Sequence, residues 1–210
     1  MKIRLILSFF LLWGLAGSWP SGLAQQRAAE PKADPAQVLR KGPHDFDFEL
    51  GRWKIHIRRA RSAANRATSW DNFDGTTANC KLWDGAAIQK WQGDGRAGHI
   101  EGLTLRLYDP QSRQWKLYAA DRGDGILAPA VVGEFRGGRG VFLDQEPING
   151  RMMWVRSVWS DITANSVHFE ASVSDAAGKT WILIAITDQT RLAEPGDCGG
   201  LSYPGDLARR

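Results

Sequence analysis

Cysteine and histidine, the residues that most often build metal sites, are scarce in this sequence. It contains two cysteines and four histidines among 210 residues. Cys80 and Cys198 form no CxxC spacing, and no HxH pair accompanies them, so we expect no metal ion. In an oxidising compartment these two cysteines could form one disulfide, and two free thiols are the alternative.

Recognisable catalytic and nucleotide-binding motifs are also absent. The sequence has no nucleophile elbow, no HExxH, no P-loop and no dinucleotide-binding fingerprint. The histidines at positions 44, 56, 99 and 168 are isolated from one another, and we interpret them as residues of the surface or of the lumen rim. We therefore expect no cofactor and assign no catalytic residue, and a binding protein is a better hypothesis than an enzyme.

A strong excess of one charge sign is missing too. The formal net charge is +4, and Lys2 and Arg4 near the N-terminus account for two of those charges. The remaining net charge is too small to indicate a nucleic-acid-binding protein. We therefore expect no nucleic-acid partner.

One long hydrophobic run occurs, and it lies at the N-terminus. The stretch LILSFFLLWGLAG follows Lys2 and Arg4, and the small residues of GLA come after it. This pattern predicts a signal peptide over residues 1–24 with cleavage before Gln25, and an uncleaved N-terminal anchor is the alternative. No later segment is apolar enough to cross a bilayer. We expect a periplasmic or secreted protein without a transmembrane segment after signal removal.

A helical hydrophobic period is missing along the chain, and short alternating segments take its place. Gly, Asp, Asn and Pro cluster between these segments, as in WDGAA, YDPQSRQ, RGGRG and PING, and such clusters favour tight hairpins. This arrangement predicts an all-β fold, an antiparallel up-and-down barrel of about 8–10 strands, with a two-sheet sandwich as the alternative. The expected strands cover about 51–60, 70–82, 86–92, 99–108, 114–120, 129–136, 140–145, 152–160, 165–174 and 180–188.

The barrel domain is expected to span residues 44–191. Residues 25–43 are rich in Ala, Gln, Pro and charge without an apolar period, which indicates a flexible linker. Residues 192–210 have a similar character and indicate a C-terminal tail. A disulfide between Cys80 and Cys198 would attach this tail to the barrel.

The phrase HDFDFELGRWKIHIRR opens the barrel domain and carries its first specific signal. Trp53, Ile55 and Ile57 fall on one face of the first expected strand. The Gly-x-Trp at this place resembles lipocalin-like (calycin) barrels, in which an Arg just past the last strand stacks over the Trp. Here AITDQTR places Arg191 at that point. The resemblance implies that Trp53 and Arg191 close one end of the barrel through a cation–π contact.

A longer set of motifs resembles one protein family, in order along the chain. FDFELGRW, LRLYDPQSRQWKLY, VGEFRGGRGVF, VRSVWSDIT and SVSDAAGKTW are similar to uncharacterised secreted bacterial proteins with an FDFxxGxW opening and an SxDxGxTW late hairpin. The resemblance covers roughly residues 44–191. It implies a lipocalin-like barrel and no established activity.

Three expected strands alternate between apolar and polar side chains, and either face could line a barrel lumen. In the simpler interpretation, Leu103, Leu105 and Leu107 face inward and the polar faces meet water. In the other interpretation, the polar and aromatic faces line a wet lumen, and one glutamate pairs with two arginines. The ligand-binding candidates are then Arg106, Tyr108, Trp154, Arg156 and Glu170.

These observations favour a binding module, an exported barrel that holds a small amphipathic or hydrophobic molecule. An enzyme with a polar cluster in its lumen is the first alternative. A structural or interaction domain with a filled barrel is the second, because side chains readily fill small barrels. The sequence names neither the ligand nor the oligomeric state.

Overall fold

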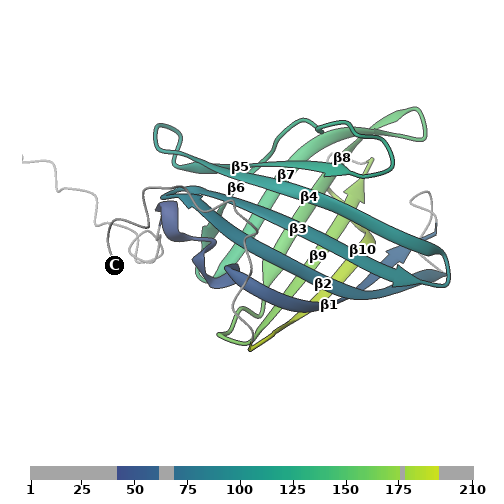
Figure 1. Ribbon diagram of the computed structural model, residues 1–210. Helices are drawn as coiled ribbons and strands as arrows, with labels where there is room; N and C mark the ends of the chain where they lie inside the picture. The colour runs from purple at the N-terminus through teal and green to yellow at the C-terminus, as the bar shows by residue number, and fades with distance from the viewer. Residues whose placement is uncertain (1–41, 62–68, 176–177, 194–210) are drawn as a thin grey trace, which may run out of the picture. The chain divides into compact units, whose positions relative to one another are not determined.

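The computed structural model describes residues 42–61, 69–175 and 178–193 (Figure 1). These residues form ten antiparallel strands. Two short 3-10 helices precede the strands, η1 (Gly42–His44) and η2 (Asp47–Glu49). Within these residues, no helix is long and apolar enough to span a membrane. The strands are β1 (Gly51–Ala60), β2 (Trp70–Trp83), β3 (Ala86–Gly95), β4 (Gly98–Asp109), β5 (Gln114–Asp121), β6 (Val131–Arg136), β7 (Arg139–Ile148), β8 (Arg151–Ser160), β9 (Ser166–Ser174) and β10 (Ile182–Arg191).

Each strand pairs with the next one in the sequence, and β1 also pairs with β10, so the sheet closes into a barrel. Tight turns make this order possible. Gly85, Gly138 and Gly150 adopt positive φ values in three of the hairpins, a conformation that glycine reaches without a steric cost. The expected all-β, up-and-down barrel is confirmed, and the sandwich alternative is wrong.

The observed strands lie close to the expected ranges, and β7 shows why one of them is longer. The sequence predicts an end at residue 145, but β7 continues to Ile148. Pro147 does not break the strand because β6 pairs with β7 only as far as Leu143. Beyond that point β7 has a neighbouring strand on one side only, and proline is tolerated at such an edge.

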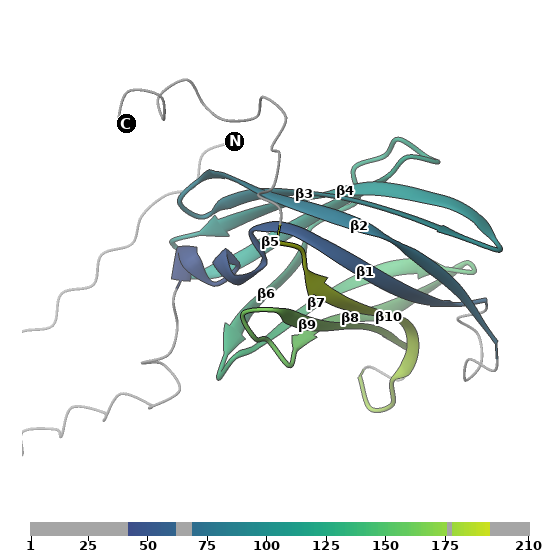
Figure 2. The ribbon, with the colours of Figure 1, turned by 60° about the horizontal axis from the view of Figure 1, so that its bottom comes forward.

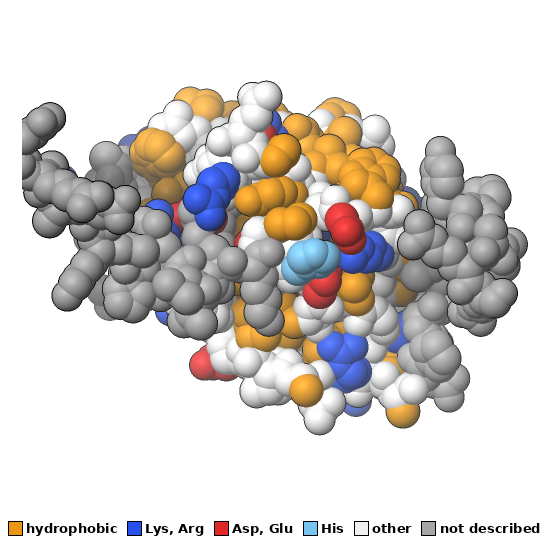
Figure 3. All heavy atoms as spheres, turned by 90° about the vertical axis from the view of Figure 1, so that its left-hand side faces the viewer, with side chains coloured by type: hydrophobic (Ala, Val, Ile, Leu, Met, Phe, Trp, Pro, Cys, Tyr) orange, Lys and Arg blue, Asp and Glu red, His pale blue; other side chains and the backbone are white. Residues whose placement is uncertain are grey.

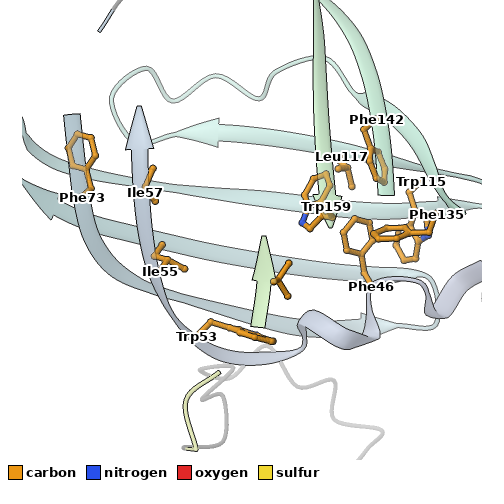
Figure 4. Close-up of a cluster of buried hydrophobic side chains, with 11 residues drawn as sticks. Phe46, Trp53, Ile55, Ile57, Phe73, Trp115, Leu117, Phe135, Phe142 and Trp159 are labelled. Atoms are coloured by element: carbon orange, nitrogen blue, oxygen red, sulfur yellow. The ribbon is translucent and has the colours of Figure 1, made fainter. Parts of the chain in front are cut away.

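The segment before β1 lies at one end of the barrel (Figure 2). From this segment Phe46 reaches the interior, where it is 2% exposed. Its ring packs edge-on against Trp115, Phe135 and Trp159, with ring-centre distances of 5.1, 4.9 and 5.5 Å (Figure 4). Each edge-to-face contact of this kind adds about 0.5–1.5 kcal/mol beyond simple burial. The aromatic core thus closes this end, where hydrophobic side chains also reach the surface (Figure 3).

Trp53 and Arg191 are in contact at the same end. Trp53 is completely buried, and the guanidinium carbon of Arg191 lies 4.0 Å from the centre of its ring system. The Nη1 and Nη2 atoms of Arg191 donate hydrogen bonds to the carbonyl oxygens of Leu50 and Phe48, at 2.7 and 2.5 Å. Arg191 therefore ties the segment before β1 to the last strand. Gly51 has a φ of +100°, which lets the chain bend at this point.

Cys80 is buried in β2 and takes part in a disulfide bond. Cys198 lies outside the described residues. The expected pairing of these two cysteines therefore stays a prediction, as do the signal peptide, the linker and the tail.

Candidate functional site

A cavity of about 240 Å³ lies inside the barrel, so the side chains do not fill the lumen. Most of its wall is apolar. Three aromatic rings, those of Trp91, Trp159 and Phe169, contribute to this wall. The aliphatic part of the wall is formed by Ile55, Ile57, Leu117, Val131 and the methyl groups of Ala119 and Ala185.

A buried ion pair forms a polar floor in this cavity. Arg106 Nη1 lies 2.5 Å from Glu49 Oε2, and both side chains are almost completely shielded from water. Glu49 Oε1 accepts a hydrogen bond of 2.6 Å from Gln189 Nε2, and Arg106 Nη2 donates one of 3.0 Å to Gln89 Oε1. A buried charge is costly unless it is paired and hydrogen-bonded. This network meets that condition for both ions.

The floor joins parts of the chain that are distant in sequence. Glu49 ends η2, Gln89 comes from β3, Arg106 from β4 and Gln189 from β10. The guanidinium carbon of Arg106 also lies 4.3 Å from the centre of the Phe46 ring. The aromatic core therefore packs against the floor. The segment before β1 supplies both Phe46 and the carboxylate of Glu49.

The polar face of β4 points into the barrel, contrary to the simpler interpretation. Thr104 and Arg106 line the cavity, and Leu103, Leu105 and Leu107 lie half-buried on the opposite face. The reason is the ion pair: Glu49 enters the lumen from the segment before β1, and Arg106 is the side chain that neutralises it.

The five ligand-binding candidates do not converge, and this part of the prediction is wrong. Arg106 lines the cavity, whereas Tyr108, Trp154, Arg156 and Glu170 do not. Tyr108 faces the interior nearer the closed end and packs on Trp115, with ring centres 5.5 Å apart.

The other three candidates lie on the outer face of the barrel. Ser157 and Trp159 of β8 and Phe169 of β9 line the cavity, so the alternate residues of these strands face outward. The guanidinium carbon of Arg156 instead stacks 4.2 Å from the Trp181 ring, and Glu170 lies 3.4 Å from His168 Nε2. Bulky rings occupy the inward positions of β8 and β9, so Arg156 and Glu170 lie on the outer face, where Arg156 is partly buried beside Trp181.

Sequence reasoning missed Glu49, Gln89 and Gln189. One signal could have found Gln189. It lies two residues before Arg191, the residue that pairs with Trp53, so both side chains point to the inner face of β10. Glu49 gave no such signal, because a 3-10 turn has no period-two alternation.

Comparison with known proteins supports the fold and leaves the function open. No family model matches this sequence, and no curated protein matches it. The S-type phycobiliprotein lyase CPES from Guillardia theta superimposes with a TM-score of 0.50 at 14% identity, over 71% of this chain and 91% of that one. The fold is a lipocalin-like barrel.

Two further solved structures are similar at lower TM-scores. The structure of EF1p2_mFAP2b bound to DFHBI has a TM-score of 0.41 at 9% identity, covering 72% of this chain and 99% of that one. A de novo designed fluorescence-activating β-barrel has a TM-score of 0.36 at 11% identity, covering 70% of this chain and 95% of that one.

The histidines of this lipocalin-like barrel pair with carboxylates on its surface. The Nδ1 atoms of His56, His99 and His168 lie 2.9, 2.7 and 2.6 Å from an oxygen of Asp74, Asp94 and Asp188 respectively. Partial burial opposes a charge on His168, but Asp188 and Glu170 outweigh it and raise the pKa of that imidazole. Within the described ranges no group of three or more His, Cys, Asp or Glu side chains could hold a metal ion.

Two acids face inward on β7, away from the polar floor. Phe142 is buried in the aromatic core, so Asp144 and Glu146, two and four residues later, share its inward face. They pair across the sheet with the buried residues Val155 and Met153. Burial raises the pKa of Asp144 to about 6, the charge of Glu146 adds to this effect, and burial also raises the pKa of Glu146.

This environment predicts a pH-dependent stability. An acid with a higher pKa in the folded state stabilises the protein below its unfolded pKa, and the contribution is lost as the pH rises through about 6. Asp144→Asn should therefore be more stable than the wild type at pH 7, on the order of 1 kcal/mol, and should have no advantage near pH 4.

Urea unfolding of both proteins at a series of pH values measures this difference. Asp121→Asn, at the exposed end of β5, is the control for removing one negative charge. A stability difference between Asp144→Asn and the wild type that does not change with pH would show that Asp144 is not desolvated.

Proposed function

We propose that this chain is an exported barrel that binds a small amphipathic or hydrophobic molecule in its lumen. The observation that carries the proposal is the cavity of about 240 Å³, with its mainly apolar wall and its compact polar floor. Ligand sites are typically apolar pockets with a few placed polar groups. A filled structural barrel would lack this space, so the cavity favours the binding module over that alternative.

The cavity limits the size of the proposed ligand. Its volume corresponds to about eight water molecules at roughly 30 Å³ each. Two or three aromatic rings with a single polar substituent would fill it. The ring system would pack against Ile55, Trp159 and Phe169, and the polar group would reach the Glu49–Arg106 floor.

Export is the second part of the proposal. It is supported by the basic start, the short apolar run and the GLA site, and by the motif resemblance to secreted bacterial proteins. N-terminal sequencing of protein recovered from the periplasm or medium should find Gln25 as the first residue. An N-terminus at Met1 would contradict it.

Filling the cavity should prevent binding of an apolar probe. N-phenyl-1-naphthylamine becomes fluorescent in apolar surroundings, and we expect saturable binding by the wild type. Ala185→Phe places a ring in the lumen and should weaken the affinity at least tenfold. Fluorescence titration measures the effect, and Ser157→Leu is a second, smaller filling change in case Ala185→Phe does not fold.

The matched control is Ala120→Phe. Ala120 follows the cavity residue Ala119 in β5 and therefore faces outward. This variant should bind the dye within about twofold of the wild-type affinity, since the probe site is untouched. Absence of saturable dye binding, or equal binding by folded lumen variants and wild type, would refute the proposed function.

A further inference from the structure

We infer that the end of the ligand that reaches the floor is uncharged and both donates and accepts hydrogen bonds, as a carboxamide or lactam does. This inference rests on the proposed function and adds the chemical class of the ligand. It excludes a carboxylate, sulfonate or ammonium group at the floor, and thus separates this barrel from a carrier of free fatty acids.

The first argument is charge balance. Among the residues that the structure describes, three charged side chains line the cavity, those of Glu49, Arg59 and Arg106. Glu49 and Arg106 neutralise each other at 2.5 Å, so the floor as a whole carries no net charge. A charged ligand group placed there would lose its water without finding a free counter-ion, and burial of an unpaired charge is strongly unfavourable. An uncharged group avoids this cost.

Arg59 does not change this conclusion. It is half-buried, and its guanidinium carbon lies 5.5 Å from the centre of the Trp91 ring system. Both residues also line a neighbouring hollow that includes Asp121 and Arg122, which lie at and just beyond the end of β5. Arg59 therefore belongs to the opposite end of the lumen from the floor, and an anion beside it would remain in contact with water.

The second argument is the pair of polar atoms that the floor offers. Within the described residues, Arg106 Nε and Gln189 Oε1 are buried and have no hydrogen-bond partner. The orientation of the Gln189 amide is fixed, because the carboxylate of Glu49 can only accept and must face the NH₂ group. Among the side chains that line the cavity, the floor thus offers the donor Arg106 Nε and the acceptor Gln189 Oε1.

The side chains that carry these two atoms are bound to the same carboxylate. Arg106 binds one oxygen of the Glu49 carboxylate and Gln189 binds the other. Arg106 is 1% exposed and Gln189 is 5% exposed, so each atom costs free energy while it stays unpaired. A carboxamide or lactam supplies a carbonyl oxygen for Nε and an N–H for Oε1, whereas a carboxylate cannot donate to Oε1.

A matched pair of probes tests the inference. 2-Naphthamide and 2-naphthoate share the same ring system and differ in the polar group, and naphthoate is ionised at pH 7. We expect the full chain to bind naphthamide at least tenfold more tightly by isothermal titration calorimetry. Gln189→Leu removes the acceptor without changing the charge and should weaken naphthamide at least fivefold.

A charge change at the floor should reverse the preference. Glu49→Gln leaves Arg106 without its counter-ion, so this variant should bind naphthoate more tightly than naphthamide. Gln92→Leu, on the exposed outer face of β3, is the control and should keep the wild-type ratio. Thermal unfolding establishes whether each variant is folded. If Glu49→Gln does not fold, the inference is tested with Gln189→Leu alone.

The results separate this inference from the proposed function. If N-phenyl-1-naphthylamine binds in the lumen but naphthoate binds as tightly as naphthamide, the uncharged-ligand inference is overturned and the binding function stands. The uncharged-ligand inference is also overturned, and the binding function again stands, if the dye binds in the lumen but neither naphthyl compound binds. If the dye also fails to bind in the lumen, both proposals fall.

Discussion

Arg106→Met is expected to destabilise the protein by about 3–5 kcal/mol, because it leaves the Glu49 carboxylate buried without its cation. Methionine keeps much of the side-chain volume, so the loss reports the charge rather than a cavity. The double variant Glu49→Gln, Arg106→Met removes both charges and should recover most of this loss. Urea unfolding at pH 7 gives the three free energies of unfolding.

Arg122→Met provides the control for this experiment. Arg122 also pairs with a glutamate, Glu101, at 2.9 Å, but 73% of its side chain is exposed. An ion pair in water contributes little, so this change should cost less than about 1 kcal/mol. Equal losses for Arg106→Met and Arg122→Met, or a double variant as unstable as Arg106→Met alone, would contradict a desolvated pair at the floor.

Trp53→Ala should cost about 3–5 kcal/mol, as expected for truncation of a large, fully buried side chain. Arg191→Ala should cost less, since the loss is limited to its hydrogen bonds and its cation–π contact with Trp53. Because the two side chains touch, the double variant should cost less than the two single losses together. Denaturant unfolding of the four proteins measures the coupling.

Trp83→Ala is the matched control, because this tryptophan is 60% exposed. It should change the free energy of unfolding by about 0.5 kcal/mol or less. Strict additivity of the Trp53 and Arg191 losses would show that the pair does not act together in closing the barrel, in spite of the 4.0 Å contact.

The strand order could be predicted because it depends on local patterns. Turn residues such as Asn149-Gly150 and Gly137-Gly138 fix where one strand ends and the next begins. Trp53 and Arg191 additionally fix which face of β1 and β10 points inward. From these two strands the inward positions of Ile55, Ile57 and Gln189 follow by alternation.

The inward faces of the central strands could not be predicted in the same way. Arg106 in β4 and Arg156 in β8 stand in similar alternating patterns, yet one points inward and the other outward. What separates them is a contact distant in sequence: Glu49 reaches Arg106, whereas the Trp159 and Phe169 rings occupy the interior beside Arg156. Alternation along a strand separates its side chains into two faces. Which face lies inside the barrel depends on such distant contacts.

The origin of the polar floor has a consequence for how the protein is made. The hydrogen bond from Gln189 to Glu49 joins residues 140 positions apart, so the first and last parts of the barrel meet there. The complete floor therefore cannot form before β10 has been synthesised, because Gln189 belongs to that strand. Contacts of such long sequence separation make folding slow. The complete site that would bind a ligand thus requires both ends of the barrel sequence, and a chain that ends before β10 cannot form it.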